Sequence, residues 1–127
     1  MNYVEMAEKV IDKLIVKSKD PNGRVNIFTT SQIRNLLAMT AEIYNEVMLL
    51  EDDKLSEEMS ERIDYLRVRY MYAAGKEQKV KELLEEAQIL DLLKKSRDSK
   101  RKFIIFYHYM ESLVAFRKFK VEFDKEN

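Results

Sequence analysis

The sequence predicts an all-α protein, a compact bundle of five or six helices with short connections. Helix-breaking residues are scarce, since the 127 residues include 2 glycines and 1 proline. Apolar residues make up 46% of the chain and recur at three- and four-residue steps, the period of a helix with one buried face. The length fits a single helical domain, residues 1–127, whose apolar content supplies a core without disulfides.

The first half of the chain predicts two helices separated by a turn. The first runs from Asn2 to about Lys17, and residues 17–26 form a turn that holds the proline and one glycine. Residues 29–31, two threonines and a serine, predict the start of the second helix, because their hydroxyls accept hydrogen bonds from unpaired backbone N–H groups. The buried stripe of this helix is expected to comprise Ile33, Leu36, Leu37, Thr40, Tyr44 and Val47.

The second half predicts three further helices. An acidic stretch near Glu51 ends the second helix, and a third runs from residue 55 or 56 to Gly75, which we interpret as a left-handed C-cap. A fourth starts near Lys76 and either continues or bends through residues 89–93. A break at Ser-Arg-Asp-Ser, residues 96–99, precedes the last helix, which begins at about residue 100 and extends beyond Phe119.

Helical phase gives the third helix two different faces. The core face is predicted to hold Met59, Ile63, Leu66, Tyr70 and Ala73. A second stripe, which we call the α-helical ridge, alternates cations with tyrosines and consists of Arg62, Tyr65, Arg69, Tyr72 and Lys76. Cations attract phosphates and tyrosine offers a flat ring to a base, so RNA binding is one interpretation of the ridge. The spacing alone favours the other, an ordinary core edge where Arg and Lys stems cover apolar surface.

Charge is balanced overall but uneven locally. The 23 basic residues equal the 23 acidic ones, so net charge gives no reason to expect nucleic acid. Residues 51–62 hold six acidic and two basic side chains, whereas residues 94–102 (KKSRDSKRK) hold six basic and one acidic. The basic segment therefore creates a local positive potential, although solvated helix ends and turns are the more common explanation for a charge run.

Nothing in the sequence predicts an enzyme, a metal site or a cofactor. The chain has no cysteine, its glycines stand alone, and no serine has a paired base at motif spacing. His108 and Glu111 share a helix face, but a half-buried, hydrogen-bonded histidine is the better interpretation. The longest apolar run, residues 103–110, is too short to cross a membrane, so we expect a soluble cytoplasmic protein.

The last helix is apolar in almost every direction. Such a helix lies either at the centre of its own bundle or against a partner protein. Its large apolar and aromatic side chains are Phe103, Ile104, Ile105, Phe106, Tyr107, Tyr109, Met110, Leu113, Val114, Phe116 and Phe119.

Four segments in order resemble one known family. They are TTSQIRNLL (29–37), YLRVRYMYAAGKE (65–77), VKELLEEAQIL (80–90) and FYHYMESLVAFRKF (106–119). Together they are similar to the small α-helical subunit of type III-A CRISPR–Cas (Csm) interference complexes, over nearly the whole chain. The tail KFKVEFDKEN departs from the Lys-Phe-x-Gly-Gly type of ending in that family.

The resemblance implies a non-catalytic, architectural function. Such subunits stack as copies along the inner face of the effector, where guide RNA pairs with target RNA, and other subunits perform the chemistry. It implies backbone contacts without sequence specificity. The expected RNA-binding residues are Arg34, Arg69 and Lys76, with Arg67 and Lys79 as weaker candidates. With this resemblance, residues 94–102 are either a second basic surface or a contact with a neighbouring subunit.

Two other classes of function stay open on the sequence. A helical dimerisation or adaptor module, with no role in nucleic-acid binding, would use the aromatic last helix for self-association. A carboxylate–histidine metal enzyme would need a bound ion.

Overall fold

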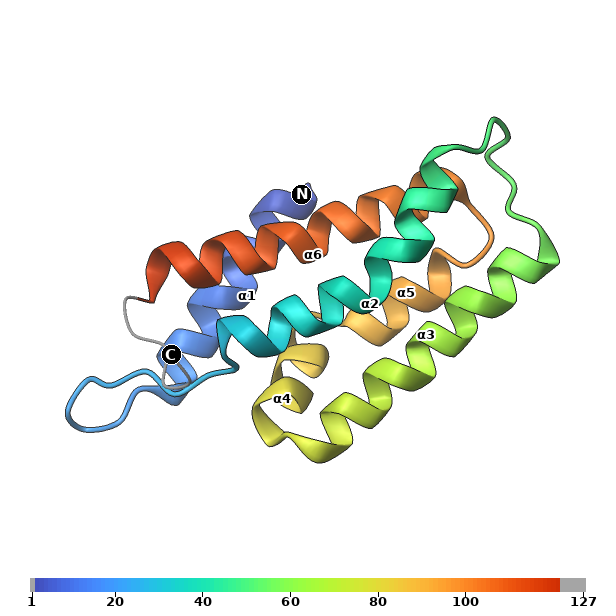
Figure 1. Ribbon diagram of the computed structural model, residues 1–127. Coiled ribbons are helices and arrows are strands. Elements are labelled where there is room, and N and C mark those ends of the chain that lie inside the picture. Colours follow the sequence, from blue (N-terminus) through green and yellow to red (C-terminus); the bar gives the residue numbers. More distant parts are fainter. Residues whose placement is uncertain (1, 122–127) are drawn as a thin grey trace.

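The all-α prediction is confirmed. The computed structural model describes residues 2–121, and within that range the chain forms six helices and no strand (Figure 1). The helices are α1 (Tyr3–Ser18), α2 (Thr30–Met48), α3 (Glu57–Lys76), α4 (Gln78–Glu86), α5 (Ile89–Lys95) and α6 (Lys100–Lys120). The final residues of the divergent tail lie outside the described residues.

Short polar side chains start four of these helices. Asn2, Ser56 and Ser99 each accept a hydrogen bond from the backbone N–H three residues further on, at 2.8, 3.1 and 3.2 Å. Thr29 forms a capping box with Gln32, in which each side chain accepts from the other residue's backbone N–H. These bonds satisfy N–H groups that the helix itself leaves unpaired. They therefore fix the starts of α1, α2, α3 and α6 close to the predicted positions.

Two connections differ from the sequence-based expectation. Gly75 is not a left-handed cap, because it lies inside α3, which ends one residue later. The turn into α4 is made instead by Glu77, whose extended backbone (φ −136°, ψ 110°) both ends α3 and starts α4. The predicted bend between the fourth helix and residues 89–93 is a full break at Gln88, which has a positive φ of 54°.

Two groups of helices build the bundle (Figure 1). α6 lies against α1 and α2 along its length, and α3 packs against α4 and α5. α2 joins the groups, because it also contacts α3. The α2–α3 pair therefore forms one side of the molecule and carries the predicted RNA surface.

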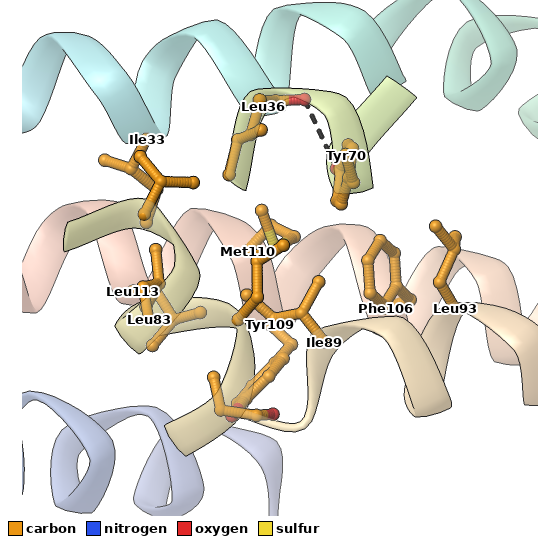
Figure 2. Packing of buried hydrophobic residues seen from close by; sticks show 14 of the residues in the cluster. Ile33, Leu36, Tyr70, Leu83, Ile89, Leu93, Phe106, Tyr109, Met110 and Leu113 are labelled. Atoms are coloured by element: carbon orange, nitrogen blue, oxygen red, sulfur yellow. Dashed lines mark hydrogen bonds between the residues drawn. The ribbon is translucent and has the colours of Figure 1, made fainter. Parts of the chain in front are cut away.

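The core lies between these groups and is built on the predicted faces. Leu36 of α2, Tyr70 of α3 and Met110 of α6 meet there, with residues of α4 and α5 on the opposite side (Figure 2). Each large apolar side chain buried in this way contributes about 1.5–3 kcal/mol. In the predicted α2 stripe, Leu37 and Tyr44 are only half-buried, and Ile43, which the prediction omitted, is buried.

α6 is the central helix of its own bundle along most of its length. Its buried side chains are Phe103, Phe106, Tyr109, Met110, Leu113 and Arg117. Ile105 is 38% exposed and Phe119 is 85% exposed, so two apolar side chains reach the surface. The Tyr109 hydroxyl donates to the backbone oxygen of Ala87 at 3.1 Å, which ties α6 to the end of α4.

Candidate nucleic-acid interface

Tyr70 orients α3 on the bundle. Its side chain is fully buried, and its hydroxyl donates to the backbone oxygen of Leu36 in α2 at 3.2 Å. The hydroxyl also touches that of Thr40, which itself donates to Leu36 O at 2.8 Å. Burial raises the pKa of Tyr70 well above its usual range, so the phenol stays neutral. With Tyr70 fixed inward, helical phase turns the opposite residues of α3 toward solvent.

The predicted α-helical ridge faces outward. Tyr65 is 65% exposed and Tyr72 is 69% exposed, while Arg69 and Lys76 are also exposed. The Nζ atom of Lys76 lies 5.0 Å from the centroid of the Tyr72 ring, a cation–π contact. The segment is a helix over its full length, so the helical interpretation of residues 65–77 is confirmed up to Lys76. The ridge presents rings and cations side by side at the surface.

Arg62 is the exception within the ridge. Its two terminal nitrogens donate to the two carboxylate oxygens of Glu46, each at 2.8 Å. This fork geometry holds the guanidinium against α2. Hydrogen bonding to Arg62 lowers the pKa of Glu46, and the same bonds raise the pKa of Arg62. The charge of Arg62 is therefore already satisfied by the protein, and the residue joins α2 to α3.

Arg34 lies in the first turns of α2, the end of that helix that is joined to the end of α3. Gln32, at the start of α2, donates from its side chain to the carboxylate of Glu77, just beyond the end of α3. The Glu46–Arg62 pair joins the other ends of the same two helices. α2 and α3 are therefore antiparallel, and Arg34, two residues after Gln32, is level with the last turns of α3. Arg34 is exposed, and its side chain leaves α2 on a different side from that of Gln32, because residues two apart are about 200° apart around a helix.

Arg69, Lys76 and Arg34 share one further property. Within residues 2–121, none of the three forms an ion pair, whereas other cations of the chain do. Glu77 is the acidic group nearest to Lys76 in the sequence, and its carboxylate is bonded to Gln32. All three are therefore exposed cations without an ion pair within residues 2–121, two of them on the ridge of α3 and one on α2.

Arg67 and Lys79 lie on other sides of the molecule. Arg67 is half-buried in a depression of about 630 Å³ between α3 and α5, which Tyr65 and Lys94 also line. Lys79 lies 3.5 Å from the carboxylate of Glu82 and lines an acidic depression between α1 and α4. Neither residue belongs to the α2–α3 surface, and Lys79 faces carboxylates.

Comparison with known proteins identifies the family. The family model described as Csm2 Type III-A matches residues 4–122. "CRISPR system Cms protein Csm2" of Streptococcus thermophilus is 42% identical over 118 residues, which cover 93% of this chain and 90% of that protein. The protein of that name from Mycobacterium tuberculosis (strain CDC 1551 / Oshkosh) is 36% identical over the same shares, and that from Enterococcus italicus is 32% identical over 91% and 87%.

The chain belongs to the Csm2 family of type III-A CRISPR systems. The family resemblance of the four quoted segments is thereby confirmed. The match extends over α1 to α6, so the ridge on α3 lies within the part of the chain that the family shares.

The basic segment of this Csm2-family chain, residues 94–102, is partly engaged within the protein. The Arg97 guanidinium donates two hydrogen bonds of 2.8 Å to Asp64, which lowers the pKa of that carboxyl. Lys100 Nζ donates to the backbone oxygens of Met48 and Leu50, at 3.4 Å for Met48. These contacts fix the α5–α6 connection, and they leave fewer free cations than the sequence pattern indicates.

His108 is half-buried, as predicted, with its Nε2 atom 3.3 Å from the hydroxyl of Tyr44. Tyr44 stacks on Tyr107 with ring centroids 3.8 Å apart, so the histidine belongs to an aromatic cluster between α2 and α6. No group of three or more potential metal-ligating side chains occurs in the part of the chain that is described. Within that same part, no helix combines the length and the hydropathy that crossing a membrane requires.

Sequence reasoning did not find the pairing of Arg62 with Glu46 or the exposure of the segment after α2. The pairing joins residues 16 positions apart on different helices, so no local pattern reports it. Met48, Leu49 and Leu50 are exposed apolar residues directly before the acidic run. The sequence did contain a signal for this exposure, because Leu49 does not continue the three- and four-residue spacing of the buried stripe of α2.

Proposed function

We propose that this Csm2-family chain is a non-catalytic small subunit of a type III-A CRISPR RNA-guided effector complex. It acts in the cytoplasm, stacks with copies of itself and other subunits along the inner face of the complex, and contacts guide and target RNA. The contacts are made to the RNA backbone without sequence specificity. The residues that we assign to RNA are Arg34, Arg69 and Lys76, with lesser contributions from Arg67 and Lys79.

The observation that carries this proposal is the unpaired state of the three strongest candidates. Cations that stabilise the fold, such as Arg62 and Arg97, are held by carboxylates at 2.8 Å. Arg34, Arg69 and Lys76 are exposed and have no ion pair within residues 2–121. When an RNA phosphate binds one of these cations, the counterions condensed on the RNA are released. The phosphate does not have to compete with a carboxylate of the protein.

The two tyrosines of the ridge support contact with RNA and not merely with an anion. Tyr65 and Tyr72 lie more than half exposed on a helix whose opposite face is fully buried. An exposed ring offers a face to a base or sugar, and it tolerates any base because every base has a π-face. Exposed rings and cations, which contact any base and any phosphate, fit a subunit that must accept any guide sequence.

The strongly shifted ionisable groups support a structural subunit. Burial raises the pKa of Tyr70 and takes that of Tyr109 to about 12. Both phenols donate hydrogen bonds to backbone oxygens inside the bundle. Such groups hold the fold together, whereas general acid–base catalysis needs a group with a pKa near the working pH at an accessible site.

The proposal is tested by co-purification. A tagged chain expressed in its own cell is expected to recover companion subunits and short RNA, and Arg69→Glu with Lys76→Glu is expected to reduce target-RNA retention by about tenfold or more. The matched control is Lys9→Glu with Lys19→Glu, which changes the same charge at exposed positions of α1 and its C-cap.

Two results would count against the proposal. Unchanged RNA retention in the Arg69/Lys76 variant would remove those residues from the interface. Recovery of subunits without any RNA, in the unmodified protein, would favour the helical adaptor module. The exposed apolar side chains Ile105 and Phe119 on α6 are the feature that such an adaptor would use.

A further inference from the structure

The loop between α2 and α3 presents an apolar tip followed by two carboxylates. Leu49 is 84% exposed and Leu50 is 37% exposed, although both are large apolar side chains. Glu51 and Asp52 come next and are also exposed. An exposed apolar pair beside charges, outside the core stripe of α2, is typical of a contact site with another protein.

This tip is held in place by hydrogen bonds to the start of α6. The Asp53 carboxylate accepts from the Ser99 hydroxyl and from the Arg101 backbone N–H, both at 2.9 Å. The Lys100 backbone N–H donates to Asp53 O at 2.7 Å, and the Leu55 N–H donates to the backbone of residue 98 at 3.1 Å. Because the loop is already ordered, binding through its tip costs little conformational entropy.

A groove whose apolarity and charge complement those of the loop tip lies near the same end of the bundle. It has a volume of about 730 Å³ and opens between the start of α1, α5 and the first half of α6. Its floor is apolar and includes Met6, Leu92 and Ile105. Two leucine side chains can pack on a floor of this kind, because their burial there removes apolar surface of both partners from water.

The rim of this groove is predominantly basic. Four cations line it, Lys94, Lys95, Arg97 and Lys102, against two carboxylates, Asp91 and Asp98. Lys95 pairs with Asp91 at 3.0 Å, and Arg97 pairs with Asp64 outside the groove. Lys94 and Lys102 are exposed and form no ion pair within residues 2–121. These two lysines are therefore available for acidic groups of a partner.

We infer that this groove receives the 48–52 loop of a second copy of the chain. Leu49 and Leu50 of one copy lie on the apolar floor of the other, and Glu51 and Asp52 face the lysines of its rim. The occupant is identified by charge and polarity, since an apolar tip followed by two carboxylates matches an apolar floor with two lysines that form no ion pair within residues 2–121. The inference rests on the proposed function, which requires copies to lie side by side.

The two halves of the contact are different surfaces, so the contact is isologous if two copies exchange tips and heterologous if each copy binds a different neighbour on each side. The loop cannot enter the groove of its own chain, because its bonds to Ser99, Lys100 and Arg101 hold it where it is. Each copy therefore offers one tip and one groove to its neighbours, and association continues beyond one pair unless the arrangement closes.

Charge reversal in two separate variants tests the contact. The loop variant carries Glu51→Lys with Asp52→Lys, and the groove variant carries Lys94→Glu with Lys102→Glu. In sedimentation of the purified full chain at low salt, each variant alone is expected to self-associate at least tenfold more weakly than the unmodified chain. An equimolar mixture is expected to recover association, since each loop then meets a groove of opposite charge.

A matched pair of apolar substitutions isolates the tip. Leu49→Ser is expected to weaken association, whereas Val16→Ser, at a position that is 73% exposed on α1, is expected to leave it unchanged. Circular dichroism checks that all variants stay folded. A monomeric unmodified chain at all concentrations, or a mixture that fails to recover, overturns the inference. RNA retention through Arg69 and Lys76 is a separate readout, so failure of this contact is distinguishable from failure of the proposed function.

Discussion

The hydroxyl of Tyr70 donates to the backbone oxygen of Leu36 at 3.2 Å, so a buried side chain of α3 is bonded to the backbone of α2. Both helices carry cations that we assign to RNA. The position of the α3 cations relative to the α2 cation therefore depends on this buried contact. A change that weakens the contact is expected to lower both the stability of the fold and the binding of RNA.

Tyr70→Phe is expected to lower the free energy of unfolding by about 0.5–1.5 kcal/mol, because it removes one buried hydrogen bond while Thr40 keeps its own bond to Leu36 O. Urea denaturation measures the change. Tyr65→Phe is the control and should have no effect on stability, since Tyr65 is exposed. Equal stability of the two variants would show that the buried hydroxyl contributes nothing.

Alkaline pH is expected to destabilise the protein through Tyr70 and Tyr109. Burial raises both pKa values from 10.0 in the folded state, that of Tyr109 to about 12. The unfolded chain therefore loses these protons first, and stability falls as pH rises above about 10, by up to about 1.4 kcal/mol per pH unit per tyrosine. Denaturation midpoints between pH 9 and 11 measure this, and Tyr70→Phe with Tyr109→Phe should flatten the curve.

The start of each capped helix and the core faces could be predicted from the sequence because they depend on local chemistry. Ser56 and Ser99 cap their helices through the backbone three residues on, and Ile63 and Leu66 follow helical phase. The break at Gln88 could not be predicted in this way. Glutamine rarely adopts a positive φ, so its conformation there is imposed by the packing of α4 and α5 against α3.

Asp53→Asn is expected to loosen the loop between α2 and α3, since the carboxylate accepts from Arg101 N–H and the Ser99 hydroxyl. The first of these bonds is the main reason that the pKa of Asp53 is lowered from 3.8. Its contribution is thus present above about pH 4 and is lost as pH falls below that value. Amide hydrogen exchange of residues 49–56 at pH 7 should accelerate in this variant.

The neighbouring residue supplies the control for that experiment. Asp52→Asn removes an exposed carboxylate that has no hydrogen bond to α6 among the described residues, so exchange in the loop should stay slow. Equal protection in the two variants would show that the Asp53 bonds do not order the loop. The thermal midpoint of Asp53→Asn should approach that of the unmodified chain as pH falls toward 3.

Arg34→Glu is expected to reduce RNA retention more than Lys79→Glu in the assembled complex. Arg34 is exposed and forms no ion pair within residues 2–121, whereas the charge of Lys79 faces Glu82 at 3.5 Å. A phosphate near Lys79 therefore meets carboxylate repulsion. Binding of labelled target RNA to complexes that contain each variant ranks the two positions. The reverse order would place the interface on the α1–α4 side.

The RNA-binding candidates show what helical phase can and cannot decide. Phase alone placed Arg69 and Lys76 on the outward side of α3, and the structure agrees. It could not decide which cations are already neutralised, because Arg62 meets Glu46 only when α2 and α3 are antiparallel in one register. It also could not separate Arg67, which turns toward α5, from the α2–α3 surface.

The salt dependence of target-RNA binding tests the central claim most directly. The slope of log affinity against log salt concentration is measured for complexes with the unmodified chain and with Arg69→Glu and Lys76→Glu combined. Loss of two phosphate contacts predicts a slope shallower by about 1.4, at about 0.7 per phosphate on single strands. An identical slope in the two complexes would contradict the assignment of the ridge to RNA.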